Sequence, residues 1–470
     1  MPDTMDDFFY KLRPKLHYTA KTGYMNDPNG LVYDENTGEY HLYYQYQNAV
    51  MPSKCTVGWG HAVSKDLIFW QEKKAVILPD DYGVIASGSA VIDRDNTSGL
   101  FNANTCEKQR FMAFYTSADV YRTGRQAICV AYSKDGYNYT KYLDGKPILY
   151  NNESQYNNDF RDPKVVRYEN GWLMITGGGK LKLFYSENLL DWEFQSAVKN
   201  VKSEDVSIDG DLEILHKYLP YNDPHGEIMP GECPDLFPLS CGGETKWLLV
   251  AGGIFYVVGD LVKTDGKIVF KSDTGKKRFY HYDNFFAHCG EGYASQSFYN
   301  DAKGRLVILS WLMDNTAPAA SGKCFNGVMS LPLEVSLAKE NGDYKLKYKW
   351  VDELYRKFEK DLPEGASSAR PLLFEGEWKN GDNVRFTAFS AENKVLFSGE
   401  KDVLKISVNG EEKSTFQLKD GVNRLSVIID GFVFSVLLNN EVQFTFFVFG
   451  SEHGYSINSG FSVKVKCFWE

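Results

Sequence analysis

Three acidic residues lie in short sequences that restrict their backbone: Asp27 in "YMNDPNG", Asp162 in "DFRDPKV" and Glu232 in "PGECPDLF". Both aspartates directly precede a proline, which favours extended geometry in the residue before it, and Glu232 lies one residue further from its proline. We expect these acids to be held at strand ends, with little freedom of the backbone, so that the direction of each carboxyl group is fixed. Two carboxyl groups that face one glycosidic oxygen are the usual means of cleaving a glycoside, because one attacks or activates water while the other donates a proton.

A turn is the competing interpretation of each of these motifs. Asp-Pro pairs are common turn formers, so one such pair alone does not indicate chemistry. Three acids with apolar or aromatic flanks favour a catalytic role over three unrelated turns.

The composition is that of a globular chain rich in aromatic residues. At 470 residues the chain is long enough for two or three domains, and its hydrophobic fraction of 43% and charged fraction of 24% are ordinary. Aromatic residues make up 15%, which favours β-structure and supplies flat faces for sugars. The formal charge of -10, without a run of Lys and Arg, argues against nucleic acid and anionic membranes as partners.

Cysteine spacing and the N-terminal sequence bear on metals and localisation. The eight cysteines show no CxxC or other metal-ligand spacing, so neither a zinc site nor a dense disulfide framework is indicated. The start "MPDTMDDFFYKLRPKL" lacks the apolar core of a signal peptide, and no stretch approaches 18 consecutive apolar residues. We expect a cytoplasmic protein without a membrane span, although a secreted mature form cloned without its signal would have the same sequence.

Short apolar segments separated by Gly, Asn and Asp dominate residues 25–345. Segments such as "QAICVAYS" and "GWLMITGGG" are typical of β-strands. A weak repeat, "SKDLIFW", "SKDGYNY" and "SENLLDW", follows such segments and ends each time in an aromatic residue. A repeated hairpin or blade element favours a β-propeller, while the irregular period leaves a large β-sandwich as the alternative.

The C-terminal part predicts a second domain. Residues 351–362, "VDELYRKFEKDL", have apolar side chains at helical spacing and predict a helix. The segments that follow, such as "VLKISVNG" and "RLSVIIDG", predict an antiparallel β-sandwich. The predicted organisation is therefore a catalytic domain over 1–345, a linker helix over 346–364 and a β-sandwich over 365–470. A homo-oligomer formed through the β-sandwich is an open alternative to a monomer.

The motifs "YMNDPNG", "FRDPK" and "ECPDL", in this order, resemble the three signature blocks of glycoside hydrolase family 32, the family of invertases, inulinases and levanases. Further blocks agree, including "WGHAVSKDLIFW", "SGSAV", "YASQSF" and "NGVMSLP". The resemblance is strong up to Pro332 and only architectural after it. It implies an all-β fold, with a five-bladed β-propeller followed by a β-sandwich, and a small saccharide substrate. It implies no metal or organic cofactor.

The resemblance also implies catalytic roles. By position in the motifs, Asp27 is similar to the nucleophile, Glu232 to the general acid/base, and Asp162 to the residue that holds the fructose hydroxyls and stabilises the transition state. Asp27 must then be ionised, and Glu232 must begin protonated, which partial burial or neighbouring negative charge favours. Retaining cleavage predicts that the carboxyl groups of Asp27 and Glu232 lie about 5 to 5.5 Å apart.

Five further residues in matching blocks are expected to bind the sugar: Asn26, Gln45, Ser87, Arg161 and Trp311. Amide and guanidinium donors would hold hydroxyl groups, and Trp311 would offer an apolar face. Gln45 and Ser87 could instead stabilise the sheet, Arg161 could pair with a structural acid, and Trp311 could belong to the core. Cys233 is expected to be a small buried neighbour of the acids, since no histidine near it in sequence would activate a thiol.

Several positions differ from the family pattern around the expected pocket wall: Tyr24, Ala86, Gly231, Leu333 and the segment "NAVMPSKCTVG", which lacks a tryptophan. No carboxyl group is lost. These differences indicate less aromatic surface on the leaving-group side, so substrate preference cannot be copied from sucrose-specific relatives.

The resemblance favours hydrolysis of terminal β-fructofuranosyl residues from sucrose, fructo-oligosaccharides or fructans. A fructosyltransferase, in which a sugar acceptor replaces water, uses the same residues. A sucrose-6-phosphate hydrolase would need a cationic phosphate patch, for which the sequence offers no convincing candidate. The sequence also leaves open a non-catalytic sugar-binding protein on the same scaffold, and an inverting five-bladed propeller enzyme that acts on arabinose-type sugars.

Overall fold

Strands dominate the structure of this chain. The computed structural model describes residues 13–48, 57–119, 123–150, 159–198, 231–281, 290–313, 325–390, 393–450, 452–457 and 462–468. Within these ranges the regular elements are strands, apart from helix α3 (Asp352–Tyr355) and two short 3₁₀ turns, η1 (Glu107–Gln109) and η2 (Tyr142–Gly145). The prediction of an all-β protein is confirmed.

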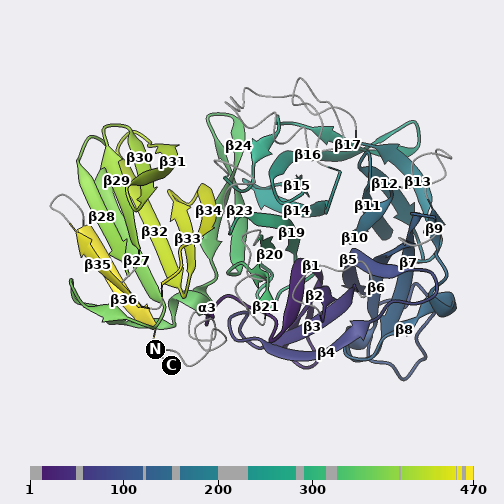
Figure 1. Cartoon of the computed structure of the whole chain (residues 1–470). Coiled ribbons are helices and arrows are strands. Elements are labelled where there is room, and N and C mark those ends of the chain that lie inside the picture. Colours follow the sequence, from purple (N-terminus) through teal and green to yellow (C-terminus); the bar gives the residue numbers. More distant parts are fainter. Residues whose placement is uncertain are drawn as a thin grey trace.

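Five sheets follow one another along the chain up to Trp350 (Figure 1). The first contains β1 (Gly23–Asp34), β2 (Glu39–Gln47), β3 (Gly58–Ser64), β4 (Gln71–Ile77) and β21 (Phe325–Asn326). The second contains β5 (Val84–Ile92), β6 (Phe111–Ala118), β7 (Gln126–Ser133), β8 (Thr140–Lys141) and β9 (Leu149–Tyr150). The third contains β10 (Arg161–Tyr168), β11 (Gly171–Gly177), β12 (Lys182–Ser186) and β13 (Glu193–Ala197).

The fourth sheet contains β14 (Asp235–Cys241), β15 (Glu244–Ala251), β16 (Phe255–Thr264), β17 (Lys267–Ser272) and β18 (Lys277–Arg278). The fifth contains β19 (Gly292–Ser297), β20 (Val307–Leu312), β22 (Val328–Met329), β23 (Leu333–Glu340) and β24 (Asp343–Trp350). The strand that starts each sheet contacts the starting strand of the next, and β19 returns to contact β1. These five inner strands, β1, β5, β10, β14 and β19, therefore form a closed ring.

A polar contact crosses each junction between neighbouring inner strands. In order around the ring, the contacts are Gly88 N to Asn29 Oδ1 at 3.1 Å, Ser89 Oγ to Pro163 O at 2.8 Å, Lys164 Nζ to Asp235 Oδ1 at 3.0 Å, Ser297 Oγ to Asp235 Oδ1 at 3.1 Å, and Tyr299 N, just after β19, to Leu31 O at 2.9 Å. Buried polar groups that are paired in this way stabilise one arrangement of the sheets. The ring is therefore held by specific bonds as well as by apolar packing.

The sequence repeat forms the same turn in three of the sheets. Each copy lies between the third and fourth strands and begins with a serine whose hydroxyl accepts a hydrogen bond from the main-chain N–H two residues later. The fourth residue of each copy adopts a left-handed conformation, with φ of 67° at Leu67, 69° at Gly136 and 66° at Leu189. The prediction that one hairpin element recurs is confirmed.

Two six-stranded sheets follow the ring. One contains β25 (Phe358–Asp361), β36 (Ser462–Phe468), β27 (Leu372–Lys379), β32 (Val422–Asp430), β33 (Val433–Leu438) and β34 (Val442–Phe447). The other contains β26 (Ser367–Ser368), β35 (His453–Ile457), β28 (Val384–Phe389), β29 (Lys394–Glu400), β30 (Val403–Val408) and β31 (Glu411–Gln417). Both contribute to one buried apolar cluster, in which the rings of Phe374 on β27 and Phe386 on β28 stack.

The predicted helix over residues 351–362 is correct only for its first turn. Helix α3 covers Asp352–Tyr355, and Phe358–Asp361 forms β25 instead. The backbone of β25 pairs with β36, and Phe358 is buried beside Phe468. Pairing and burial in a sheet outweigh the helical spacing of the apolar residues, because tertiary contacts override local propensity.

The N-terminal segment is bonded to the six-stranded sheet that contains β32, through Asp430 at the end of that strand. The carboxylate of Asp430 accepts hydrogen bonds from the N–H groups of Lys15, Leu16 and His17, at 2.8, 2.8 and 2.9 Å. The ring of His17 contacts Asp430 Oδ2 at 2.8 Å and Ser435 Oγ at 3.0 Å. Because the side chains of His17 and Asp430 are fully buried, these bonds are shielded from water.

Within the described ranges, no helix has the length and apolar character needed to cross a membrane.

Replacing Asp430 by Asn should lower the free energy of unfolding by about 2–3 kcal/mol. The substitution puts an amide among donors that need an acceptor, so buried N–H groups lose their partners. Urea denaturation followed by tryptophan fluorescence would measure the change, with the exposed Asp420→Asn as the matched control. Equal stability of the two variants would contradict the role of Asp430.

Candidate active site

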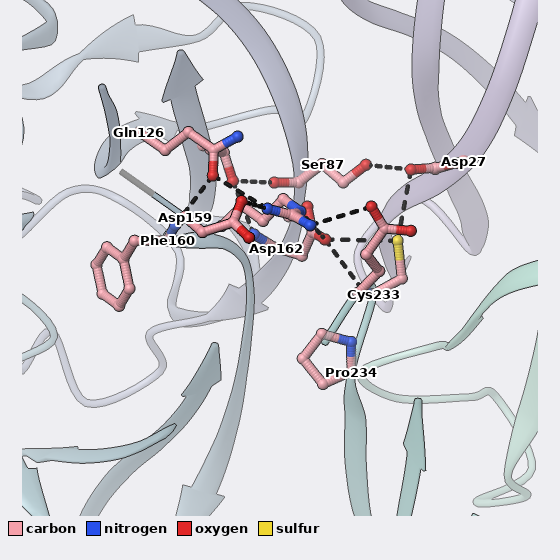
Figure 2. Close-up of polar contacts among 12 residues, drawn as sticks. Asp27, Ser87, Gln126, Asp159, Phe160, Asp162, Cys233 and Pro234 are labelled. Atoms are coloured by element: carbon pink, nitrogen blue, oxygen red, sulfur yellow. Dashed lines mark hydrogen bonds and ion pairs between the residues drawn. The ribbon is translucent and has the colours of Figure 1, made fainter. Parts of the chain in front are cut away.

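The three acidic residues selected from the sequence lie at the same end of the inner strands. Asp27 is on β1, Asp162 is on β10, and Glu232 comes just before β14. The thiol of Cys233 lies 3.5 Å from Oδ2 of Asp27 and 3.7 Å from Oδ2 of Asp162 (Figure 2). Arg161 reaches Oε1 of Glu232 with its Nη2 at 3.1 Å and Oδ2 of Asp162 with its Nε at 3.6 Å. The fold therefore brings together three acids that are far apart in sequence.

Irregular pairing marks this end of four inner strands. The register shifts lie between Met25 and Pro28 on β1, Ala86 and Gly88 on β5, Arg161 and Lys164 on β10, and Tyr293 and Gln296 on β19. A bulge bends its strand and redirects a side chain. Asp27, Ser87 and Asp162 each lie within one of these irregularities, which explains how a regular ring can aim them at one place.

The backbone of Asp162 differs from the prediction. Its φ is 58°, in the left-handed region, although the proline that follows was expected to keep it extended. Aspartate tolerates this conformation better than most residues. Its N–H donates to Thr116 Oγ1 at 2.8 Å, and its carboxylate accepts from the N–H of Cys233 at 2.9 Å. These tertiary bonds outweigh the local preference.

Three of the predicted sugar-binding residues contact the carboxylate of Asp27. Ser87 Oγ donates to Oδ2 at 2.6 Å, Gln45 Nε2 donates to Oδ2 at 3.1 Å, and Asn26 Nδ2 lies 3.3 Å from Oδ1. Burial raises the pKa of Asp27, the hydrogen bond from Ser87 opposes this rise, and the charge of Glu232 adds to it. The polar neighbours hold the plane of the carboxylate, while their contact with a sugar stays a prediction.

Asp162 is a buried acid with a raised affinity for a proton. It is buried, and burial raises its pKa to about 7. The charge of Arg161 and the hydrogen bond from Cys233 N oppose the rise, while the charges of Glu232 and Asp27 add to it. Burial, with a smaller contribution from the neighbouring acids, thus raises the proton affinity of Asp162.

Glu232 is the most exposed of the three acids, with 43% of its side chain accessible. Its Oε1 faces Arg161, and its Oε2 accepts a hydrogen bond from the hydroxyl of Tyr293 on β19. Burial raises the pKa of Tyr293 well above its usual value, so this residue remains a neutral donor. Tyr293 was not assigned a role from the sequence, although it lies in the block "YASQSF", which signalled the region.

Arg161 links the acids of the site. Its guanidinium pairs with Asp159, Asp162 and Glu232, and Nη1 donates to Gln126 Oε1 at 3.3 Å. Burial opposes its charge, but the neighbouring carboxylates raise the pKa of Arg161. Arg161 thus pairs with acids, but two of them, Asp162 and Glu232, are the predicted catalytic acids and not structural ones chosen apart from the site.

Trp311 on β20 lies beside the Glu232 side of the site. Its ring makes edge-to-face contacts with Tyr24 and Tyr293, at centroid distances of 6.3 and 6.4 Å. Its indole nitrogen is buried without a hydrogen-bond partner in the described part of the chain. Trp311 therefore forms part of an aromatic wall. Most of the segment "NAVMPSKCTVG" lies outside the described residues.

A buried ion pair joins two of the sequence motifs that contain the acids. Lys164, two residues after Asp162, places Nζ 3.0 Å from Oδ1 of Asp235, three residues after Glu232. Nζ also donates to the carbonyl oxygen of Ser297 at 2.8 Å. Both charged residues are at least 95% buried. Sequence reasoning missed this pair, although Lys164 and Asp235 lie within the quoted motifs "FRDPK" and "ECPDL".

Cys233 is a small buried neighbour of the acids, as predicted. Burial, together with the charges of Asp162 and Asp27, raises the pKa of its thiol well above the usual value. The sulfur therefore stays protonated and donates weakly to the carboxylates. Among the described residues, no group of three or more His, Cys, Asp or Glu side chains is arranged to hold a metal ion.

The sequence matches known proteins over most of its length. The family model "Glycosyl hydrolases family 32 N-terminal domain" matches residues 17–349. The levanase of Bacillus subtilis strain 168 is 37% identical over 461 residues, covering 91% of this chain and 58% of that protein. The fructan beta-fructosidase of Streptococcus mutans is 34% identical over 358 residues, covering 73% of this chain and 22% of that protein. This chain thus spans about a fifth to three fifths of the length of these relatives.

Solved structures share the fold. The exo-inulinase from Aspergillus awamori has a TM-score of 0.76 at 22% identity, and the alignment covers 98% of both chains. The sucrose-6-phosphate hydrolase from Lactobacillus gasseri has a TM-score of 0.73 at 17% identity, covering 98% of this chain and 93% of that one. At these identities the likeness concerns the fold alone.

The buried carboxyl group of Asp162 predicts a pH-dependent stability. Its pKa of about 7 lies above the value in an unfolded chain, so the folded protein binds this proton more tightly. The stabilisation is complete below the unfolded pKa and is lost as the pH rises through about 7. The parent should therefore lose stability as the pH rises, and Asp162→Asn should not. The difference in free energy of unfolding, variant minus parent, should increase by about 3 kcal/mol from about pH 5 to pH 8.

Urea denaturation at several pH values checks this expectation, with the exposed Asp420→Asn as control. Parallel pH curves for the parent and Asp162→Asn would contradict it.

Proposed function

The chain belongs to glycosyl hydrolase family 32, and from this premise we propose that it is a retaining β-fructofuranosidase. It would release terminal β-D-fructofuranosyl residues from sucrose, fructo-oligosaccharides or fructans. The proposal depends on the meeting of three acids at one end of the ring, where Cys233 contacts Asp27 and Asp162 and Arg161 contacts Asp162 and Glu232. Asp27 is held by hydrogen bonds from Ser87 and Gln45, as a fixed nucleophile must be, and half-exposed Glu232 can reach a leaving group from the more open side.

The domain organisation belongs to the same proposal. The five sheets would be the blades of a five-bladed β-propeller, which would be the catalytic domain. The two six-stranded sheets would form a β-sandwich over residues 365–470. The closed ring of inner strands supports the first assignment, and the shared apolar cluster supports the second. Because β24 ends at Trp350, the catalytic domain extends slightly beyond 345.

In the first step, Asp27 attacks the anomeric carbon of fructose. Its Oδ2 accepts bonds from Ser87 and Gln45, while among the described residues Oδ1 has only the longer contact with Asn26. Oδ1 is therefore the oxygen with the greater freedom to form the bond. Positive charge develops at the anomeric carbon, and the ionised carboxylate both stabilises and captures it.

Glu232 gives its proton to the glycosidic oxygen as the bond to the leaving group breaks. This step leaves Glu232 as a carboxylate, and Arg161 and Tyr293 each donate to one of its oxygens. Both contacts stabilise the charge that the reaction creates. In the second step the same carboxylate takes a proton from water, which then releases fructose from Asp27.

Asp162 would bind fructose hydroxyls during both steps. Its carboxylate is fixed by Cys233 N and faces Arg161, so its orientation is set before a sugar arrives. A preorganised acceptor strengthens binding in the transition state without reorganisation. Asn26, Gln45 and Ser87 would contact the same sugar in addition to orienting Asp27, and Trp311 would cover an apolar face.

Replacing Asp27 by Ala should reduce fructose release from sucrose at least about 10³-fold, because no covalent intermediate can form. Fructose and glucose measured separately over sucrose, inulin, levan and sucrose 6-phosphate would give the rates. A parent protein that is inactive on every β-fructoside, but binds sugar, would instead indicate a binding protein. Excess glucose over fructose would indicate transfer to a sugar acceptor.

The stereochemistry of the product is a second test. With methanol as acceptor, we expect methyl β-D-fructofuranoside as the first product, because two displacements at the anomeric carbon retain its configuration. NMR spectroscopy of the early reaction mixture identifies the anomer. The α anomer would indicate inversion and would rule out the nucleophilic role of Asp27.

A further inference from the structure

The main chain at Glu232, which lies in a bend just before β14, is bonded to two turns of neighbouring sheets. The carbonyl oxygen of Gly231 accepts a hydrogen bond from the N–H of Gly178 at 2.6 Å. The carbonyl oxygen of Glu232 accepts one from the N–H of Gly252 at 2.8 Å. Gly178 follows β11 in the third sheet, and Gly252 follows β15 in the fourth. The candidate general acid is thus held between two turns that lie far apart in sequence.

Hydrogen bonds also hold the main chain on the C-terminal side of Glu232. The N–H of Cys233 donates to Oδ2 of Asp162 at 2.9 Å (Figure 2), and the carbonyl oxygen of Pro234 accepts from Nε2 of Gln296 at 3.3 Å. Cys233 has a φ of 42°, in the left-handed region, which is unfavourable for a residue with a side chain. Such a conformation persists where the surrounding structure enforces it. The bonds on both sides of Glu232 therefore maintain one strained conformation.

The turn after β11 approaches Gly231 so closely that a side chain would not fit between them. A Cβ atom added to Gly177 would lie 2.5 Å from the carbonyl oxygen of Gly231, which is closer than such atoms come in proteins. A Cβ atom added to Gly231 would lie 3.1 Å from the carbonyl oxygen of Gly179. Gly231 is one of the positions that differ from the family pattern, and the turn occupies the space that a larger side chain would need.

The turn after β15 links Glu232 to β19, the strand that also supplies a hydrogen bond to its carboxylate. Gly252 donates to the carbonyl oxygen of Glu232, and its own carbonyl oxygen accepts from the N–H of Ala294 on β19 at 2.9 Å. A Cβ atom added to Gly253 would lie 2.6 Å from Oγ and 2.8 Å from the main-chain nitrogen of Ser295. The close approach of this turn therefore fixes the main chain of Glu232 relative to β19.

We propose that Gly177 and Gly253 are positioning residues for the general acid of the reaction. Because neither has a side chain, the two turns can reach the main chain that carries Glu232 and hold its carboxyl group where it can protonate the glycosidic oxygen. A misplacement of about 1 Å in an active site can cost about 10²-fold in rate, so a small change at either turn should lower catalysis. This inference rests on the proposed function, because it takes Glu232 as the proton donor.

A substrate that needs no acid separates this role from a general loss of structure. Sucrose needs a proton on its leaving oxygen, whereas β-D-fructofuranosyl fluoride loses fluoride, which departs without one. In Gly177→Ala, kcat/KM measured by fructose release should fall about 10- to 100-fold for sucrose and less than about threefold for the fluoride. The added methyl group would displace Gly231 without left-handed strain, since the φ of Gly177 is not positive.

Gly171→Ala is the matched control for this variant. Gly171 begins β11 and Gly177 ends it, so the two residues lie at opposite ends of one strand. A Cβ atom added to Gly171 would lie 2.6 Å from the carbonyl oxygen of Ser186, so the control creates a similar clash away from Glu232. The control should keep the parent ratio of kcat/KM for sucrose to kcat/KM for the fluoride.

Gly253→Ala tests the second turn and should lower the same ratio. Its control is Gly266→Ala, because Gly266 has a φ of 77°, close to the 71° of Gly253, and an added Cβ would contact nothing within 4 Å. Gln296→Leu is a milder variant that keeps the test available if neither glycine variant folds. It loses the bond to Pro234 and should lower the ratio about two- to fivefold.

A parent-like ratio in the folded variants, or an equal decrease in the two controls, would overturn the positioning role. Glu232→Gln tests the premise separately, since it should nearly abolish cleavage of sucrose and spare the fluoride. If Glu232→Gln changes both rates equally, the proposed function fails in its assignment of the acid. If it behaves as expected while the turn variants keep the parent ratio, only the inference about the turns fails.

Discussion

The carboxyl groups of Asp27, Asp162 and Glu232 lie close together, and this crowding of like charge is the constraint on which the rest of the site depends. Arg161 faces Asp162 and Glu232 directly, while Asp27 receives its stabilisation from neutral donors such as Ser87. Burial raises the pKa of both aspartates, so the negative charge of each aspartate is held against a tendency to take up a proton. Such an arrangement persists only when the surrounding structure is rigid.

The ring of inner strands supplies this rigidity. Every junction between neighbouring inner strands has a polar contact, and the contact between Lys164 and Asp235 is a buried ion pair. An ion pair removed from water is costly unless its remaining bonds are satisfied, and here Ser297 satisfies both partners. Since Lys164 and Asp235 follow Asp162 and Glu232 closely in sequence, the pair fixes the spacing of the strands that carry two of the acids.

Sequence reasoning located the acids and the repeated turn, because both depend on local chemistry that short motifs preserve. It did not predict the left-handed backbone of Asp162, where bonds to Thr116 and Cys233 outweigh the effect of the proline. It also missed Tyr293, whose role arises only when β19 closes the ring beside Glu232. Residues far apart in sequence acquire these contacts through topology, which a single sequence does not display.

The burial of the acids changes from one side of the site to the other, and under the proposed function this gradient would favour attack on a chain end. Asp27 and Asp162 are 9% and 6% exposed and lie among polar side chains, whereas 43% of the Glu232 side chain is accessible. A fructose unit bonded to Asp27 would then lie beside buried groups, while the group attached to it would remain on the more exposed side. A terminal fructose unit would satisfy both conditions, and an internal unit, with chain on both sides, would not.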